Sequence, residues 1–389
     1  MRNVYLDNNA TTQVAPEVIE AMTPFFREYW GNPSSMHFFG GQVRKYVDRA
    51  REQVAALIGA DPSEIVFTAS GTEADNAAIR GAVEAAGRSL TVVTTRVEHP
   101  AVLAPCRHMA GQGHRVIELG VNAVGDLEPV DVREAARLGP AIVSVMWANN
   151  ETGVLFPIPQ IAEEAKAEGA LMHTDAVQAV GKLPIDLRRV PVDMLSLSGH
   201  KLHAPKGIGA LYIRRGTRIN PFILGGHQEN NRRAGTENVP YIVGLGVACE
   251  MAASHLREEM IRVARLRDRL QEGILSRCPN TRVNGNAGQR LPNTVNISFE
   301  YIEGESILYG LSDMGIAASS GSACTSGSLE PSHVLRAMGV PFTAVHGSVR
   351  FSLSRYNTEP EIDYVVEHMP AIVDRLRALS PFVPKEARK

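Results

Sequence analysis

Cysteine is scarce in this chain, with four residues among 389. They stand far apart and form no C-x-x-C pair, which excludes a disulfide-rich scaffold. An excess of charge of one sign is also lacking, because 40 lysines and arginines face 42 aspartates and glutamates. A net charge of −2 gives no general attraction for phosphate backbones or anionic lipids, so we expect neither nucleic acid nor a membrane as a partner.

Long apolar runs are missing as well. No run approaches the roughly 20 residues that a membrane-spanning helix needs, and Asp7 interrupts the N-terminal segment before an apolar signal core can form. A cytoplasmic location is therefore expected. With 44% hydrophobic and 21% charged residues, the chain is ordinary for a globular protein and long enough to bury a large core.

Apolar runs of strand length alternate with amphipathic stretches of helix length through the first two thirds of the chain. We expect strands over Glu64–Ala69, Leu90–Thr95, Ala141–Trp147, Ala170–Thr174, Asp193–Ser198 and Gly209–Arg214. Helices are expected over Thr72–Ala86, Ala101–Gln112, Pro129–Leu138 and Pro157–Glu168. This alternation predicts βαβ units in an α/β fold, with a mostly parallel sheet covered by helices on both faces.

The pattern changes after a long helical stretch from about Val239 to Arg277. Predicted strands and helices then alternate over Thr294–Phe299, Glu303–Met314, Pro331–Met338, Ser348–Leu353 and Glu359–Leu379. A smaller second domain is therefore expected, with a boundary near residue 255. Within it, Ala318–Ser328 is rich in serine and glycine and too polar for a core, so we expect a mobile loop there.

Lys201 follows a predicted buried strand and precedes a turn rich in glycine and proline. Partial desolvation at such a place favours the neutral amine, which can form a Schiff base. Taken alone, the position is better explained by a loop lysine that reaches solvent. His200 and His203 lie beside it, but their three-residue spacing without a third ligand gives only weak support for a zinc site.

Two other strand ends carry candidate ligand-binding residues. Asp175 ends a predicted strand, at the edge where open parallel sheets bind ligands. A buried carboxylate there needs a cation, which the protonated ring of a pyridoxal cofactor would supply, although a helix N-cap is the structural alternative. Gly71 and Thr72 open a helix whose free N–H groups would suit a phosphate, and plain capping by Ser70 or Thr72 is the alternative there.

Cys324 lies in the polar loop Ala318–Ser328. A loop cysteine in apolar-poor surroundings is a poor packing residue and a good nucleophile that reaches a site and then carries a group away. Cys106, Cys249 and Cys278 fall in predicted helices or apolar runs, where packing explains them. An amine, a strand-end acid, a phosphate-binding helix start and a loop thiol together fit one reaction.

With these motifs in place, the chain resembles class V pyridoxal-phosphate enzymes, specifically cysteine desulfurases of the nitrogen-fixation (NifS) type. The segments that carry the resemblance are Tyr5–Thr12, Gly31–Ser35, Val97–Pro100, Met146–Gly153, Thr174–Lys182, Gly199–Lys201, Arg233–Asn238, Ser319–Thr325 and Arg350–Arg355. The resemblance implies a fold-type I transferase. Residues 1–15 would pack with the small domain, residues 16–255 would form the large cofactor-binding domain, and residues 256–389 would form a small α/β domain carrying the Cys324 loop.

The resemblance also assigns roles around a pyridoxal ring. Lys201 would tether pyridoxal 5'-phosphate as a Schiff base. Asp175 would pair with the ring nitrogen, and Gln178 would hydrogen-bond the ring hydroxyl. His99 would stack on the ring and deprotonate a thiol or relay a proton.

The remaining assignments concern the phosphate and the substrate. Gly71, Thr72, Ser198 and His200 would hold the phosphate, joined by Thr236 from the other subunit of a homodimer. Asn149 would contact the cofactor and, together with Arg350, the substrate carboxylate. Without the resemblance, Asn149 fits a turn, Thr236 a helix cap and Arg350 a strand end.

The implied reaction converts L-cysteine to L-alanine. Lys201 would move the α-proton, and the thiolate of Cys324 would attack the substrate sulfur and carry it as a persulfide. An iron–sulfur scaffold protein would accept this sulfur for cluster assembly, with nitrogenase maturation as the expected purpose. The resemblance is also compatible with transient iron ligation by Cys324, shared with a scaffold protein.

Three other functions stay open at this point. A housekeeping desulfurase of iron–sulfur cluster assembly or a selenocysteine lyase could use the same scaffold. A non-catalytic sulfur- or cluster-binding protein, in which Lys201 is structural, is the third. Protein that remains colourless after pyridoxal phosphate is added would favour this last reading.

Overall fold

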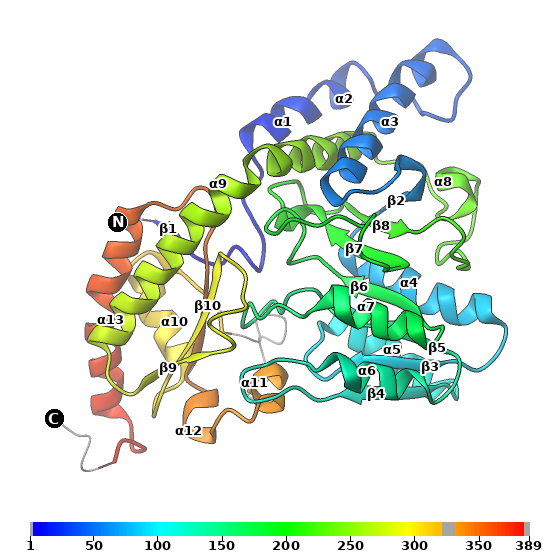
Figure 1. Ribbon diagram of the computed structural model, residues 1–389. Coiled ribbons are helices and arrows are strands. Elements are labelled where there is room, and N and C mark those ends of the chain that lie inside the picture. Colours follow the sequence, from blue (N-terminus) through cyan, green and yellow to red (C-terminus); the bar gives the residue numbers. More distant parts are fainter. Residues whose placement is uncertain (1–2, 321–330, 385–389) are drawn as a thin grey trace.

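The computed structural model describes residues 3–320 and 331–384. Its larger part is built on a seven-stranded sheet (Figure 1). The strand order is β2-β8-β7-β6-β5-β3-β4, with β8 antiparallel to both neighbours and the other pairs parallel. The strands are β2 (Ile65–Thr68), β3 (Thr91–Thr95), β4 (Arg115–Leu119), β5 (Ala141–Ser144), β6 (Leu171–Asp175), β7 (Met194–Ser198) and β8 (Gly209–Ile213).

Helices cover this sheet on both faces because successive strand residues point to opposite sides. Val92 packs with α4 (Gly71–Ala86) and α5 (Pro100–Gly111), whereas the next residue, Val93, belongs to the core that holds α6 (Pro129–Ala136) and α7 (Ile158–Ala167). Other strands alternate in the same way. The predicted α/β class with a mostly parallel sheet is confirmed.

A second core forms around a three-stranded antiparallel sheet with the order β12-β10-β9. A short parallel pair, β1 (Val4–Tyr5) with β11 (Ile316–Ala317), brings the N-terminal segment to this core. The remaining elements of this region are β9 (Thr281–Asn284), β10 (Thr294–Phe299), α10 (Gly304–Asp313), β12 (Ser348–Ser352) and α13 (Glu359–Leu379). The short helices α11 (His333–Ala337) and α12 (Phe342–Val345) lie in the same part of the sequence, but their buried residues belong to the core of the large sheet.

The helix α9 (Val239–Arg277) runs through both cores (Figure 1). Its residues up to Ala252 belong to the core of the large sheet, and those from Val263 belong to the second core. Among the described residues it is the one helix long and apolar enough, over 18 residues, to cross a membrane, and half of that window is buried inside the protein. Core packing against α1 (Pro16–Met22) and α3 (Phe38–Ile58) accounts for its apolar character. The boundary near residue 255, inside this helix, stays a prediction.

Sequence analysis placed no element between residues 13 and 63. The structure has three helices there, α1 (Pro16–Met22), α2 (Pro24–Arg27) and α3 (Phe38–Ile58). A helical spacing of buried residues was present in α3, at Val43, Val47, Ala50 and Val54. Short elements complete the described chain: η1 (Pro62–Glu64), η2 (Gly199–Lys201) and α8 (Gln228–Asn231). Residues 321–330 lie outside the described residues, so the predicted loop around Cys324 stays a prediction.

Candidate active site

A cavity of about 370 Å³ opens where β3, β6 and β7 end. Ligand sites of open parallel sheets lie at this edge, and cavities of roughly 300–1,000 Å³ are usual for small-molecule sites. The cavity wall holds nine of the residues that the sequence singled out: Gly71, Thr72, His99, Asp175, Gln178, Ser198, His200, Lys201 and Arg350. The structure thus brings together residues that span most of the chain.

One end of the cavity is suited to an anion. Ser70 caps α4 by accepting a hydrogen bond from the Glu73 N–H, and Gly71 and Thr72 form the first turn of this helix. A β-carbon on Gly71 would lie 2.7 Å from Val177 Cγ2, so only glycine fits between the helix start and that side chain. The helix dipole, the free N–H groups and the nearby Ser198 hydroxyl make this end electropositive.

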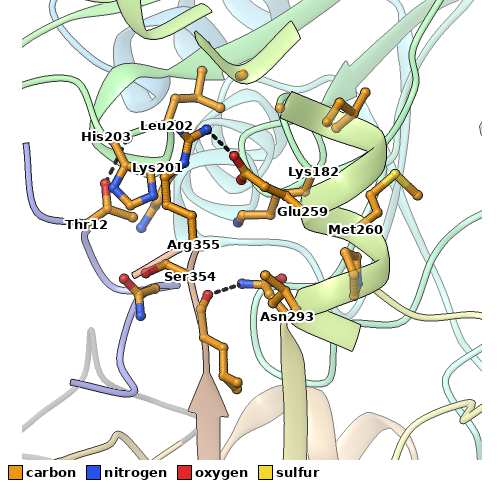
Figure 2. Close-up of a pocket in the computed structure, with 17 residues that line it drawn as sticks. Thr12, Lys182, Lys201, Leu202, His203, Glu259, Met260, Asn293, Ser354 and Arg355 are labelled. Carbon is orange, nitrogen blue, oxygen red and sulfur yellow. Dashed lines mark hydrogen bonds and ion pairs between the residues drawn. The ribbon is translucent and has the colours of Figure 1, made fainter. Parts of the chain in front are cut away.

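Lys201 occupies the end of the short helix η2, directly after β7. Its Nζ lies 2.5 Å from the carbonyl oxygen of Asn9 and 2.7 Å from that of Ala10. The side chain separates the large cavity from a smaller one of about 50 Å³, which Figure 2 shows. Backbone carbonyls of the N-terminal segment therefore help to position the amine.

Asp175 ends β6 and is buried, with 6% of its surface exposed. Its Oδ1 accepts a hydrogen bond from the Val177 N–H at 2.9 Å. Burial raises the pKa of Asp175 to about 6, against the opposing effects of this hydrogen bond and of Lys201. A carboxylate in this position gains most from a cationic partner inside the cavity.

Asp75, whose charge interacts with that of Asp175, belongs to a group of buried polar side chains. Burial raises the pKa of Asp75 well above its ordinary value, and the charges of Asp175 and Glu98 add to this shift. His173, whose pKa falls to about 3 because it is buried, lies 3.6 Å from Asp75 and contacts Ser144 and Ser196. Burial therefore favours the protonated form of Asp75 beside Asp175.

His99 is the N-cap of α5, where its Nδ1 accepts a hydrogen bond from the Ala101 N–H at 3.1 Å. Burial, followed by the charge of Lys201, lowers the pKa of His99 to about 4. The ring is therefore neutral at physiological pH, with its proton on Nε2. His99 lines the cavity as a neutral imidazole.

Gln178 and Arg350 also line the cavity. Gln178 Nε2 donates to the Asn9 carbonyl at 3.0 Å, and Lys182 Nζ donates to Gln178 Oε1 at 2.7 Å. Arg350 is buried in β12, where it forms an ion pair with Asp7 at 2.8 Å and donates to the Asn150 carbonyl. Its Nε has no hydrogen-bond partner within the described part of the chain.

Two assigned residues lie outside the wall of this cavity. Asn149 is buried and outside the cavity wall, and its Oδ1 accepts hydrogen bonds from the backbone N–H groups of Glu151 and Thr152, as in a turn. Thr236 lines a different cavity of about 150 Å³. Cys324 lies outside the described residues. Within those residues, no group of three or more histidines, cysteines or acids is arranged for a metal ion.

Sequence analysis missed four residues of the cavity or its support. Glu98 is fully buried, accepts hydrogen bonds from Thr95 Oγ1 and the Met146 N–H, and has its pKa raised to about 8 by burial. Glu151 and His333 line the cavity, as does Asp75. Acids embedded in apolar strand ends and helix starts were a signal for Glu98 and Asp75. His333 carried no local signal because its neighbours in space are distant in sequence.

The three remaining cysteines are buried. Burial raises the pKa of Cys106 and Cys249 to about 12, and that of Cys278 to about 11. Their thiols are unreactive at neutral pH, in agreement with their predicted packing role.

Comparisons with known proteins agree with this geometry. The family model for class-V aminotransferases matches residues 4–365. A cysteine desulfurase of Trichormus azollae is 60% identical over 100% of this chain and 97% of its own length. The cysteine desulfurase NifS of Azotobacter vinelandii is 57% identical over 98% of this chain and 95% of its own length.

Solved structures give the same result. A NifS-like protein superposes with a TM-score of 0.91 at 38% identity, covering 96% of this chain and 100% of its own. SspA, solved in complex with cysteine, superposes with a TM-score of 0.80 at 35% identity over 92% of this chain and 100% of its own. The chain therefore belongs to the class-V aminotransferase family, among its NifS-like cysteine desulfurases.

Proposed function

We propose that this cysteine desulfurase binds pyridoxal 5'-phosphate at Lys201, converts L-cysteine to L-alanine, and takes the released sulfur onto Cys324 as a persulfide. The observation that carries the proposal is the meeting of an amine, a buried carboxylate, a neutral histidine and a helix N-terminus on one cavity wall. Enzymes of this family depend on pyridoxal phosphate. The whole-chain identity to curated cysteine desulfurases supports the substrate.

The residues present fit this cofactor. The N-terminus of α4, with no room for a β-carbon at Gly71, suits a phosphate. Lys201 supplies the amine that an aldehyde needs. The buried Asp175 suits a protonated pyridine nitrogen, because a cation there offsets the cost of burying its charge. When bound, the pyridoxal ring supplies an electron sink for the substrate Cα.

The chain's own residues bind the substrate and move its α-proton. The buried guanidinium of Arg350 has an unsatisfied Nε, so we assign it to the substrate carboxylate. Lys201 Nζ, once released from the cofactor, takes the α-proton as its neutral amine. Asn149 contributes by fixing the turn that carries Asn150 and Glu151 along the cavity wall.

His99 has a narrower role than general base. Its neutral ring can stack on the cofactor and its Nε2–H can hydrogen-bond a sulfur anion, whereas accepting a proton at Nε2 requires the other tautomer. Relay of a thiol proton through His99 therefore includes a tautomer change. This assignment keeps His99 in contact with the reacting atoms.

The working protein is proposed to be a homodimer. Thr236 lies beside Arg233 and Glu237 on a cavity separate from the one that holds Lys201. This placement supports a role for Thr236 at the phosphate site of the other subunit. The loop before it is anchored, since Glu229 accepts two hydrogen bonds from Arg51 at 2.7 Å each and one from the Phe67 N–H.

An iron–sulfur scaffold protein in the cytoplasm is the proposed sulfur acceptor. The identity to NifS of Azotobacter vinelandii supports a purpose in nitrogenase maturation. In this proposal the Cys324 thiolate attacks the substrate sulfur, so that an S–S bond forms while the Cβ–S bond breaks. The electron pair of the broken bond stays on carbon and is protonated to give the alanine methyl group. The sulfur then leaves Cys324 for an acceptor thiol.

The proposal is tested with Cys324→Ala, assayed beside the Cys106→Ala variant as a matched control. Loaded with pyridoxal phosphate, Cys324→Ala should keep the visible absorption of the Lys201 linkage while alanine and sulfide release falls by at least about 10³-fold. Cys106→Ala should retain turnover because its thiol is buried. Undiminished alanine release by Cys324→Ala would contradict the assigned nucleophile.

A further inference from the structure

Lys182 is a second lysine beside Lys201, and the assigned roles leave it unexplained. It stands in the turn after Gln178, and both lysines lie on the wall of the smaller cavity in Figure 2. Burial, followed by the charges of Lys201 and Arg350, lowers the pKa of Lys182 to about 7. Within the described residues Lys182 has no ion pair with a carboxylate, and its amine donates to Gln178 Oε1 at 2.7 Å. Burying the charged form of this amine lowers the stability of the folded protein, so the presence of a lysine at this position points to a functional role.

The contacts of Gln178 fix which way its amide faces. The ammonium form of Lys182 has donors and no acceptor, so it pairs with the amide oxygen, and Oε1 faces Lys182. The Asn9 carbonyl can only accept, so Nε2 faces Asn9 at 3.0 Å. Both assignments agree, and the amide has one orientation. Nε2 then has a second N–H to offer, and Gln178 lines the large cavity.

We propose that Lys182 is a positioning residue, which holds the Gln178 amide so that an N–H rather than an oxygen faces the cofactor in the cavity. This inference rests on the proposed function, in which Gln178 hydrogen-bonds the ring hydroxyl oxygen. Without Lys182 the amide could rotate and present Oε1, an acceptor, to an oxygen that carries negative charge. A repulsive contact would then replace a hydrogen bond.

The amine also strengthens the contact that it orients. A donor on Oε1 polarises the amide and makes its N–H groups better donors, as in other hydrogen-bond chains. Lys182 is not part of the wall of the large cavity, so it acts on the ring oxygen through Gln178. The nearby Lys201 and Arg350 add positive charge to the same region, so loss of Lys182 would remove orientation more than overall charge.

The test measures pyridoxal phosphate binding to apoprotein by fluorescence titration, together with the absorption spectrum of the loaded protein. Lys182→Met should raise the cofactor Kd by about tenfold and change the absorption spectrum, because the Gln178 amide is released. Lys182→Gln, whose amide can still donate to Gln178 Oε1 without a charge, should restore most of both. An equal loss in both variants would show a role for charge rather than orientation, and would overturn the inference.

A double-mutant cycle separates this inference from the proposed function. Gln178→Ala should weaken cofactor binding, and adding Lys182→Met to it should change the Kd less than twofold, since Lys182 acts through Gln178. If Lys182→Met weakens binding equally with and without Gln178, the inference is wrong and the role of Gln178 stands. If Gln178→Ala leaves the Kd and the spectrum unchanged, the role of Gln178 fails, and the inference falls with it.

Lys166→Met is the matched control for losing a lysine amine. Lys166 Nζ lies 2.9 Å from both carboxylate oxygens of Asp193, outside the large cavity. This variant should keep the wild-type cofactor Kd and spectrum. Thermal unfolding of the apoproteins checks folding, and Lys182→Met should be at least as stable as the wild type because it removes a buried charge. A markedly less stable Lys182→Met apoprotein would mean that Lys182 is structural and would overturn the inference.

Discussion

The wall of the large cavity is built from two sets of residues that are held in place in different ways. The first set, which we call the strand-end wall, comprises Asp175 and Ser198, the last residues of β6 and β7, and Lys201, three residues after β7. The sheet backbone therefore fixes where they start. The second set, which we call the loop wall, comprises Asn9, Glu151, His333 and Arg350, which come from segments far apart in sequence. Arg350 lies in β12 and His333 opens α11. The strand-end wall is ordered by the sheet, whereas the loop wall depends on individual polar contacts.

Those contacts are specific and mostly buried. Asn9 Nδ2 donates to Thr294 Oγ1 at 2.8 Å, and Ser332 Oγ donates to Glu151 at 2.5 Å. His333 lies 2.9 Å from the Glu98 carbonyl. Changes in the strand-end wall should therefore alter the chemistry, whereas changes in the loop wall should alter substrate binding.

The strand-end wall is tested most strongly by Lys201→Ala. Removing the tethering amine, which is also the proposed proton carrier, should lower alanine formation by at least about 10³-fold and abolish the absorption band of the lysine linkage. Lys206→Ala, an exposed lysine in the same segment, is the matched control and should keep both. Substantial turnover in Lys201→Ala would show that another amine carries the reaction.

Glu98→Gln tests how the buried acid Glu98 affects the stability of the protein around the strand-end wall. The folded protein holds the Glu98 proton up to about pH 8, whereas an unfolded chain releases it near pH 4.5. The stability that the protonated acid provides is present below pH 4.5 and is lost as the pH rises to about 8. Glutamine cannot ionise, so the unfolding free energy of the variant apoprotein should exceed that of the wild type by a few kcal/mol at pH 8, with a smaller difference at pH 5.

Urea unfolding at a series of pH values measures this effect. Glu118→Gln, on the edge strand β4, controls for the loss of a partly exposed acid on the same sheet. A difference between Glu98→Gln and the wild type that does not change with pH would show that Glu98 does not titrate in this range.

The loop wall is tested by Asp7→Asn. Asp7 holds the guanidinium of Arg350 at 2.8 Å, and loss of its charge should loosen the group assigned to the substrate carboxylate. The KM for cysteine should rise about tenfold while kcat changes less than threefold, because the reacting atoms contact the other wall. Steady-state kinetics give both constants. A fall in kcat with an unchanged KM would contradict the division between the two walls.

Residues of the strand-end wall were easier to predict from the sequence than residues of the loop wall. Strand-end residues such as Asp175 and Lys201 were recognisable because a buried strand, a turn and a polar residue are neighbours in the chain. Arg350 was assigned only through the resemblance to a family, and Glu151 was missed, since its contact with Ser332 joins segments far apart in sequence. Local patterns cannot show such long-range pairs. The helix α3 was missed although its apolar spacing was present.

The central claim is that Lys201 and its cofactor make the sulfur of cysteine available to Cys324. Peptide mass spectrometry of the loaded protein after incubation with L-cysteine, without reductant, tests it most directly. The account predicts one added sulfur atom on the peptide that contains Cys324, and none in Lys201→Ala. Sulfur added equally to the peptides of Cys106, Cys249 or Cys278, or an unmodified Cys324 in protein that forms alanine, would contradict it.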